Sequence, residues 1–128
     1  MNTTDINTLA DRFFQAIEAK DLAGLRACYH DDTTVWHNFD DHAQSVDDNV
    51  ALLGRLCRFA TSLRYTEVER ITYDGGFVQR HVLVVQVGDR SVRIPACLVA
   101  QTLAGRIHRI FEYLDSAHRT ALYAGAGS

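Results

Sequence analysis

His37 and Glu112 are the side chains in this sequence best suited to proton transfer. His37 stands between Trp36 and Asn38 on a short predicted strand, and Glu112 stands near the end of the last predicted strand. An imidazole titrates near neutral pH, so His37 could act as a base or as a proton shuttle. A carboxyl group among apolar neighbours suits general acid or base catalysis. The alternatives are a histidine hydrogen-bonded to backbone at its strand end and a glutamate paired with an arginine in solvent.

Other histidines and acidic residues carry a faint metal-binding signal. Four histidines and two aspartates could supply ligands: His37, His42, His81, His108, Asp40 and Asp41. None of them shows the His-x-His or His-Glu-x-x-His spacing that places two ligands on one face of an element. The sequence also contains no glycine-rich phosphate loop and no Gly-x-Ser-x-Gly elbow. We therefore predict neither a metal site nor an organic cofactor.

The composition indicates a single soluble domain. The chain has 128 residues, of which 47% are hydrophobic and 23% charged, which is ordinary for a globular protein with its own core. A net charge of −3 without a run of lysine or arginine argues against a nucleic-acid partner. No apolar segment has the length of a membrane span, and no signal peptide is recognisable. We expect one domain over 1–128, with loose ends at 1–4 and 117–128.

The three cysteines are predicted to be reduced thiols. Cys28, Cys57 and Cys97 are odd in number and contain no Cys-x-x-Cys pair. Cys28 and Cys57 fall on the apolar stripes of predicted helices, where cysteine usually behaves as a small core residue. Free thiols are typical of a reducing compartment, so a cytoplasmic location is expected.

Three long strands dominate the second half of the chain. Residues 77–87, 92–102 and 106–115 are rich in β-branched and aromatic side chains, which favour a pleated sheet. Gly88 and Gly105 lie in the turns between these strands and supply the positive φ that tight hairpins need. Residues 62–74 are predicted to form a more polar edge strand and residues 33–39 a short one.

The predicted helices all precede the long strands. Apolar residues at helical spacing predict helices over 5–19 and 22–29, and Ser45 can cap a third that runs to Ala60. Helices gathered before a mostly antiparallel sheet indicate an α+β domain with the helices on one sheet face. Such a helix layer across a curved sheet leaves a cone that can hold a pocket.

This order of elements resembles the nuclear transport factor 2-like superfamily with its cone-shaped, cystatin-like fold. The superfamily includes ketosteroid isomerases, SnoaL-like polyketide cyclases and limonene-epoxide hydrolases. Residues 11–25 (DRFFQAIEAKDLAGL) and 29–35 (YHDDTTV) are similar to ketosteroid isomerases, as is the hairpin from Gly88 to Cys97. The ending 111–116 (FEYLDS) resembles SnoaL-like members. The resemblance implies three N-terminal helices packed on a curved, mixed but mainly antiparallel sheet.

The catalytic residues of these relatives transfer only in part. The general-base Asp, oxyanion Tyr and oxyanion Asp of the ketosteroid isomerases fall on His37, Phe13 and Cys97, so the usual steroid isomerisation is not expected. The catalytic acid that hydrolases and cyclases carry on the last strand falls on Glu112. The Arg-x-Asp pair of the epoxide hydrolases falls within the QRHV sequence at 79–82, which has no carboxylate.

Strand alternation assigns the remaining pocket candidates. His108, Ile110 and Glu112 share one face of the last strand, and the resemblance implies that this face is concave. Ile107, Arg109, Phe111 and Tyr113 then lie on the outer face. The predicted substrate-binding set is Phe13, Trp36, Asn38, His81, Cys97, His108 and Ile110, beside the catalytic pair His37 and Glu112.

Two registers are left open by the sequence. A slip of one residue in the strand at 33–39 would turn Trp36 and Asn38 into the pocket instead of His37. A two-residue turn at 88–89 would pair Cys97 with Arg80 and put His81 on the outer face. A three-residue loop or a bulge would pair Cys97 with His81 instead.

The sequence favours a cofactor-independent enzyme that acts on a hydrophobic small molecule with a carbonyl group or a cyclic ether. Such chemistry would be of the isomerase, cyclase, hydrolase or lyase type. A non-catalytic binder of an apolar metabolite is the first alternative, and a structural dimerisation domain whose cone is filled by side chains is the second. Apolar residues that alternate away from the pocket also predict a homodimer through the outer sheet face.

Overall fold

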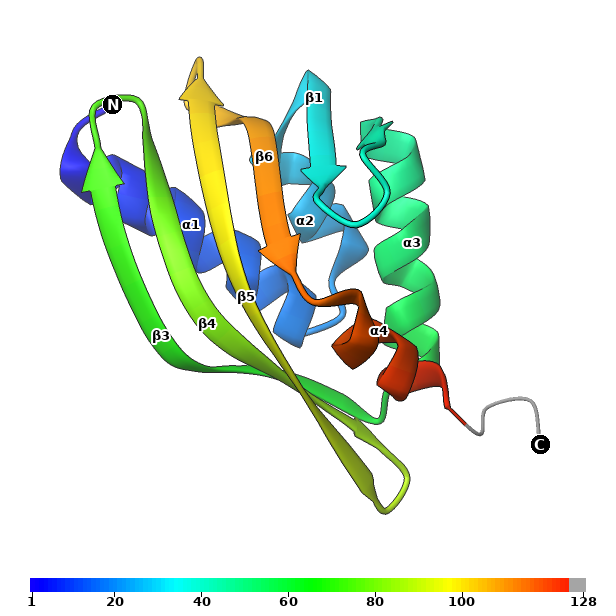
Figure 1. Cartoon of the computed structure of the whole chain (residues 1–128). Coiled ribbons are helices and arrows are strands. Elements are labelled where there is room, and N and C mark those ends of the chain that lie inside the picture. Colours follow the sequence, from blue (N-terminus) through cyan, green and yellow to red (C-terminus); the bar gives the residue numbers. More distant parts are fainter. Residues whose placement is uncertain (125–128) are drawn as a thin grey trace.

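A computed structural model describes residues 1–124, which form four helices and a six-stranded sheet (Figure 1). The helices are α1 (Thr3–Glu18), α2 (Leu22–Cys28), α3 (Val46–Phe59) and α4 (Ser116–Tyr123). The strands are β1 (Tyr29–His37), β2 (Ala43–Gln44), β3 (Ser62–Tyr73), β4 (Gly76–Val87), β5 (Arg90–Leu103) and β6 (Arg106–Leu114). The predicted α+β architecture is confirmed, with element ends that differ from the sequence prediction by a few residues.

The sheet has the order β2-β1-β6-β5-β4-β3. Only β1 and β6 pair in parallel, and the other neighbours are antiparallel, so the sheet is mixed but mainly antiparallel. Because β1 and β6 are far apart in sequence, their pairing brings the two halves of the chain together at the centre of the sheet. The segment between β1 and α3 contributes the two-residue strand β2.

The first three helices begin at side-chain caps and bury one face each. α1 starts with a capping box in which the Asn2 side chain accepts from the Asp5 backbone N–H and Asp5 reaches back to Asn2. The cap is thus Asn2, three residues before the start of the predicted helix over 5–19. Ser45 caps α3 as the sequence indicated, and Asp21 caps α2. The buried faces of α1 and α3 form one side of the hydrophobic core.

A bulge bends the sheet around this core. Thr66 pairs with Val82 and Glu69 pairs with Arg80, so β3 has one more residue here than β4. Glu67, within this bulge, adopts a positive φ of 54°. A bulge increases the local twist and bends the strand that carries it. The resulting curve of β3 and β4 is visible in Figure 1. The bulge lies opposite His81.

A second bulge corrects the predicted alternation on β6. Gln101 pairs with Arg109 and Thr102 pairs with Ile107, so His108 is an extra residue on β6. As a result Ile107 is buried in the core, as Ile110 is, although the sequence placed Ile107 on the outer face. His108 is correspondingly removed from the face that carries Ile110.

Helix α4 corrects the prediction that the chain is loose from residue 117 onward. Asp115 caps it by accepting from the Ala117 backbone N–H, and Leu122 is buried. Arg90 donates to the carbonyl oxygens of Ala121 and Leu122 at 2.9 and 3.0 Å, which ties the helix end to β5. At the N-terminus, helix α1 begins at Thr3, within the segment 1–4 that was predicted to be loose. Residues 125–128 of the predicted tail lie outside the described part of the chain.

The cysteines agree with their prediction. Cys28 and Cys57 are buried, Cys97 is half-buried, and all three are free. Within residues 1–124, no helix has the length and apolar character needed to cross a membrane.

Candidate acid–base site

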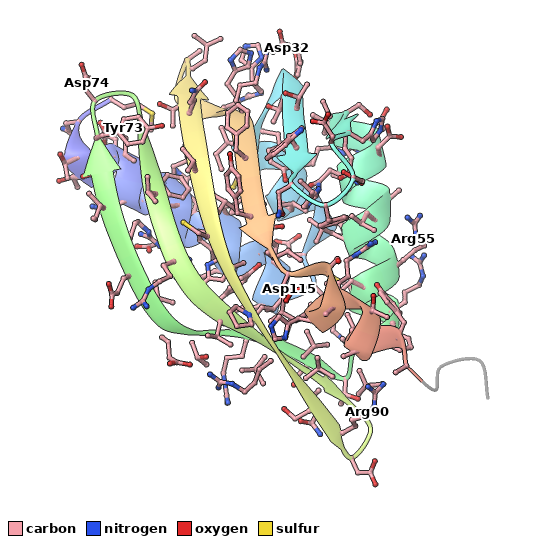
Figure 2. The ribbon with its side chains drawn as sticks, viewed as in Figure 1. Asp32, Arg55, Tyr73, Asp74, Arg90 and Asp115 are labelled. Carbon is pink, nitrogen blue, oxygen red and sulfur yellow. The ribbon has the colours of Figure 1, made fainter. Side chains whose placement is uncertain are left out.

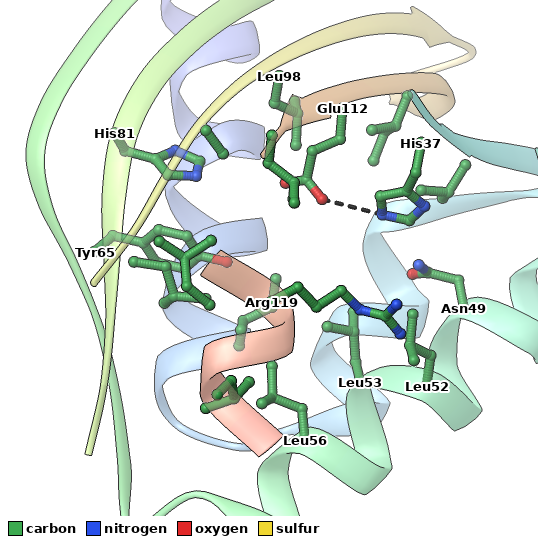
Figure 3. A pocket seen from close by; sticks show the side chains of 18 of the residues that line it. His37, Asn49, Leu52, Leu53, Leu56, Tyr65, His81, Leu98, Glu112 and Arg119 are labelled. Atoms are coloured by element: carbon green, nitrogen blue, oxygen red, sulfur yellow. Dashed lines mark ion pairs between the residues drawn. The ribbon is translucent and has the colours of Figure 1, made fainter. Parts of the chain in front are cut away.

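A cavity of about 120 Å³ lies between the concave sheet face and helices α1, α3 and α4 (Figure 3). Most of its wall is aliphatic or aromatic: Phe13, Ile17, Val35, Leu52, Leu53, Leu56, Leu83, Ile94, Leu98, Ile110, Leu114 and Leu122 among others. Eight lining residues carry polar groups: Tyr29, His37, Asn49, Tyr65, His81, Glu112, Arg119 and Tyr123. An apolar cavity with a few convergent polar groups is the usual form of a small-molecule site.

His37 and Glu112 face each other in this cavity. They are direct neighbours in the parallel register of β1 and β6, and Nε2 of His37 lies 3.1 Å from Oε1 of Glu112 (Figure 3). Their side chains are only 8% and 22% exposed. Asn38 fixes the register, because its backbone N–H donates to the Glu112 carbonyl and its Oδ1 accepts from the Leu114 N–H.

The second nitrogen of His37 indicates how the pair shares its protons. Nδ1 is buried and has no hydrogen-bond partner among the described residues. A proton on Nδ1 would therefore leave a buried donor unpaired, which typically costs about 1–3 kcal/mol. A neutral imidazole that donates from Nε2 to an ionised Glu112 avoids this cost. The geometry thus suits Glu112 as the base and His37 as the group that holds it.

His81 enters the cavity from β4 and is oriented by a chain of polar side chains. Arg70 donates to Asp11 at 2.8 Å and, through Nε, to Oε1 of Gln79 at 2.9 Å. Because the Gln79 oxygen accepts from Arg70, its amide nitrogen is left to donate to Nδ1 of His81, 3.0 Å away. The neutral His81 therefore carries its proton on Nε2.

Burial favours this neutral form. Desolvation lowers the pKa of His81 below its ordinary value, and the negative charge of Glu112 opposes the shift only in part. At neutral pH, His81 is consequently an uncharged hydrogen-bond donor at Nε2. A neutral histidine of this kind can donate to an oxygen that gains negative charge.

Tyr65 brings a second donor to the same side of the cavity. Its ring packs edge-on against His81 and Phe14, and its backbone N–H donates to Glu18 at 2.9 Å. The hydroxyl group points away from its strand (Figure 3) and makes no hydrogen bond to another described residue. Burial, with the charge of Glu112, holds the pKa of Tyr65 well above its ordinary value, so the hydroxyl keeps its proton.

Two further polar groups lie along the wall. The Tyr29 hydroxyl donates to Oδ1 of Asn49 at 2.6 Å, and the Asn49 amide donates to Gln44 at 3.1 Å. Both the carbonyl oxygen and the amide nitrogen of the Asn49 side chain are thus already hydrogen-bonded. Arg119 of α4 stacks its guanidinium over Phe39, 5.0 Å from the ring centre, and adds a positive charge to the lining.

The predicted site residues divide into two groups. Phe13, His37, His81, Ile110 and Glu112 line the cavity. Four others lie elsewhere, and their assignment to the pocket is corrected: Trp36, Asn38, Cys97 and His108. The Trp36 indole donates to Asp41 and contacts Tyr113. The Asn38 side chain accepts a hydrogen bond from the Leu114 backbone N–H of β6.

The position of His81 contradicts the prediction that a two-residue turn would put this side chain on the outer face. The hairpin has the two-residue turn, with Arg80 paired to Cys97 and His81 paired to Ala96. His81 nevertheless lines the cavity, because Ala96, and not Cys97, is on the concave face. The prediction depended on an inward Cys97, which the resemblance implied.

Three polar lining residues, Tyr65, Asn49 and Arg119, were not predicted from the sequence. The alternation of Leu63 and Tyr65 was a usable signal that one face of β3 points inward, although charged residues later in the strand hid it. Arg119 belongs to a helix that was not predicted.

Comparisons with solved structures support the fold. PrhC from Penicillium brasilianum NBRC 6234 matches with a TM-score of 0.84 and 10% identity over 94% of this chain and 87% of that one. A putative SnoaL-like polyketide cyclase from Shewanella denitrificans OS-217 matches with a TM-score of 0.79 and 12% identity over 96% and 98%. An epoxide hydrolase of the LEH-like type from M. tuberculosis matches with a TM-score of 0.73 and 17% identity over 98% of each chain.

A search of curated proteins finds no match. The sequence model of the SnoaL-like domain matches residues 10–110, which include His37, Tyr65 and His81 and end just before Glu112. The chain therefore belongs to the SnoaL-like domain family.

Proposed function

We propose that this protein is an enzyme that performs acid–base chemistry on a small hydrophobic molecule with a carbonyl group or a cyclic ether. The observation that carries the proposal is the His37–Glu112 pair, 3.1 Å apart and largely buried in an apolar cavity. The names of two structural neighbours, a polyketide cyclase and an epoxide hydrolase, are compatible with such chemistry. Proton transfer by a positioned side chain typically accelerates a reaction by about 10²–10⁴-fold.

Glu112 would act as the general base. It accepts from Nε2 of His37, which holds one carboxylate oxygen and leaves the other free for a substrate proton or a water molecule. With a carbonyl substrate, Glu112 removes a proton from the adjacent carbon. With a cyclic ether, it takes a proton from a water molecule whose oxygen bonds to a ring carbon while the carbon–oxygen bond of the ring breaks, and the released alkoxide oxygen takes a proton from Tyr65 or His81.

Tyr65 and His81 would stabilise the charge that develops on the substrate oxygen. Both line the cavity with Glu112, and both are neutral donors at neutral pH. They would replace the hydroxyl and carboxylic-acid donors that the isomerase-like positions Phe13 and Cys97 lack. Donors fixed before the reaction stabilise an enolate or alkoxide without reorganisation.

The volume of the cavity limits the substrate to a compact molecule. At about 120 Å³ it is close to the roughly 150 Å³ of an engineered apolar cavity that binds benzene. A single six-membered ring with one oxygen is therefore a suitable probe, whereas a four-ring steroid requires a larger space. This remaining volume also favours a ligand-binding function over a cone filled by its own side chains.

The test uses cyclohexanone and cyclohexene oxide as probes. Exchange of the α-protons of cyclohexanone in D₂O is followed by NMR, and opening of cyclohexene oxide to its diol by chromatography. We expect the protein to accelerate at least one of these reactions over buffer, with saturation at high probe concentration. Ligand-induced NMR shifts at cavity residues without any acceleration would refute the enzyme and favour the non-catalytic binder.

We further propose a homodimer through the outer sheet face. Trp36 packs against both Phe111 and Tyr113 there, and Tyr113 remains 47% exposed. A second copy would remove this aromatic cluster from water. Light scattering at micromolar concentration should give twice the 14.4 kDa chain mass, and a monomer would contradict the proposal.

A further inference from the structure

A group of three potential metal ligands lies at the end of the sheet away from the cavity. Nδ1 of His30, Oδ1 of Asp32 and Nε2 of His108 all lie within 4.8 Å of one another. The His30 and His108 nitrogens are 2.6 and 2.8 Å from the same Asp32 oxygen. None of the three residues lines the cavity. Figure 2 shows Asp32 at the end of the sheet opposite Asp115, which caps α4.

Two irregularities in neighbouring strands create this group. The bulge in β6 makes His108 an extra residue. In β1 the register shifts between Tyr29 and Thr34, so the intervening residues form an arch that carries His30 and Asp32. In a regular parallel pair, the side chains of His30, Asp32 and His108 would stay spaced along their strands and would not converge.

Hydrogen bonds hold the arch against the bulge. The buried Thr33 hydroxyl lies within hydrogen-bond distance of two carbonyl oxygens, those of His30 at 2.8 Å and Ile107 at 2.6 Å. Arg109 donates to the Asp32 carbonyl at 3.1 Å. The backbone that carries all three ligand groups is thus fixed by contacts that do not use the ligand atoms themselves.

One ligand atom of the group lacks a hydrogen-bond partner. Nε2 of His108 is buried and, despite its distance of 2.8 Å from Asp32, has no partner with hydrogen-bond geometry among residues 1–124. An orphaned imidazole nitrogen beside a carboxylate is a typical setting for a cation.

We infer that His30, Asp32 and His108 bind a divalent transition-metal ion of the Zn²⁺ class. Two imidazoles and one carboxylate are borderline ligands that suit Zn²⁺, Co²⁺ and Ni²⁺ better than Mg²⁺ or Ca²⁺. Solvent completes the coordination, because Asp32 is 68% exposed and leaves one side of the site open to water. The ion would fasten the arch of β1 to the bulge of β6.

Binding requires only a small local change. Tetrahedral zinc with bonds of 2.0–2.1 Å separates its ligand atoms by about 3.3 Å, so the contacts of 2.6 and 2.8 Å to Asp32 must lengthen by about 0.5–0.7 Å. Rotation of the exposed Asp32 side chain can supply this movement. The backbone contacts of Thr33 and Arg109 stay in place.

The test is calorimetric titration of the metal-free protein with ZnCl₂, with Asp32→Asn as the principal variant. We expect one Zn²⁺ per chain and an affinity at least about tenfold weaker in Asp32→Asn, since even outer-sphere changes cost about 10–100-fold. Asp31→Asn is the matched control, because Asp31 lies on the same arch but faces Arg106, 3.9 Å away, and it should keep the wild-type affinity.

A second variant and a second metal separate this site from unspecific binding. His108→Gln should also lose at least tenfold, while His42→Gln, which changes an exposed histidine outside the group, should lose nothing. Co²⁺ should give a visible absorption spectrum that is absent in Asp32→Asn. Circular dichroism checks that each variant is folded. Absence of binding by the wild type, or equal affinities in Asp32→Asn and Asp31→Asn, would overturn the inference.

Discussion

The two ends of the β1–β6 pair carry the same kinds of side chain and differ in how the backbone presents them. At one end His37 and Glu112 are paired in regular parallel register, so both side chains enter the cavity. At the other end the bulge at His108 and the arch in β1 turn His30, Asp32 and His108 away from it. Strand register therefore decides whether histidine and carboxylate meet inside the protein or at its surface.

Burial then decides what each pair can do. Glu112 is 22% exposed and faces apolar walls, whereas Asp32 is 68% exposed and open to solvent. A base in a partly dry cavity can act on a hydrophobic substrate, while an open carboxylate between two imidazoles suits a hydrated cation. The following predictions test this division, from the largest expected effect to the smallest.

Glu112→Gln should produce the largest effect. The change keeps the shape of the side chain and removes its ability to accept a proton. We expect the catalysed exchange of cyclohexanone protons to fall by about 10²-fold or more. Binding of cyclohexanone, measured by NMR shifts of cavity residues, should be retained. A variant with full turnover would remove Glu112 from the mechanism.

Tyr65→Phe should have a smaller effect on the same reaction. The phenyl ring preserves the packing against His81 and Phe14 and removes only the hydroxyl donor. Loss of one neutral donor to a developing oxyanion should lower kcat by roughly tenfold or more, with little change in KM. If KM rises and kcat stays constant, Tyr65 binds the substrate without stabilising its transition state.

His81 should make the protein less stable at acidic pH. Because its pKa is lowered in the folded state, the unfolded chain binds the proton more readily below pH 6.5, the ordinary value. The contribution is fully present above that value and is lost as the pH falls towards the folded pKa. Urea unfolding at pH 7.5 and 5 should show a smaller loss in His81→Gln than in the wild type. The exposed-residue control His42→Gln should lose as much as the wild type.

Changes at the end of the β1–β6 pair that carries His30, Asp32 and His108 should leave proton transfer in the cavity almost unaltered. Asp32 and His108 do not line the cavity, so the exchange rates of Asp32→Asn and His108→Gln should stay within about twofold of the wild type, as expected for independent sites. These rates are measured in the presence of EDTA. A large loss in either variant would mean that the two ends of the pair are coupled.

The sequence predicted the regular parts of this fold and missed the irregular ones. Alternation and turn residues located the long strands, but the choice between pairing Cys97 with Arg80 and with His81 was left open until the structure showed the Arg80 pairing. No glycine or proline signals the bulge at His108, which reverses the predicted positions of His108 and Ile107. Helix α4 is short, and such helices depend on tertiary contacts, here with Arg90, that local sequence does not reveal.

The candidate site shows the same limit. His37 and Glu112 could be identified because their residue types suit the chemistry and matched positions in the resemblance. Their contact depends on the parallel pairing of strands far apart in the chain. The tautomer of His81 depends on Arg70 and Gln79, and the role of Tyr65 depends on the bend in β3. These features follow from tertiary geometry, which residue types and spacing do not determine.

The central claim is that His37 and Glu112 act as one unit. A double-mutant cycle on the exchange of cyclohexanone protons tests this claim most directly, with Glu112→Gln, His37→Asn and the double variant compared with the wild type. Residues that act as a unit are strongly non-additive, so the double variant should be about as slow as Glu112→Gln alone. Losses that multiply in the double variant would show two independent groups and contradict the proposed pair.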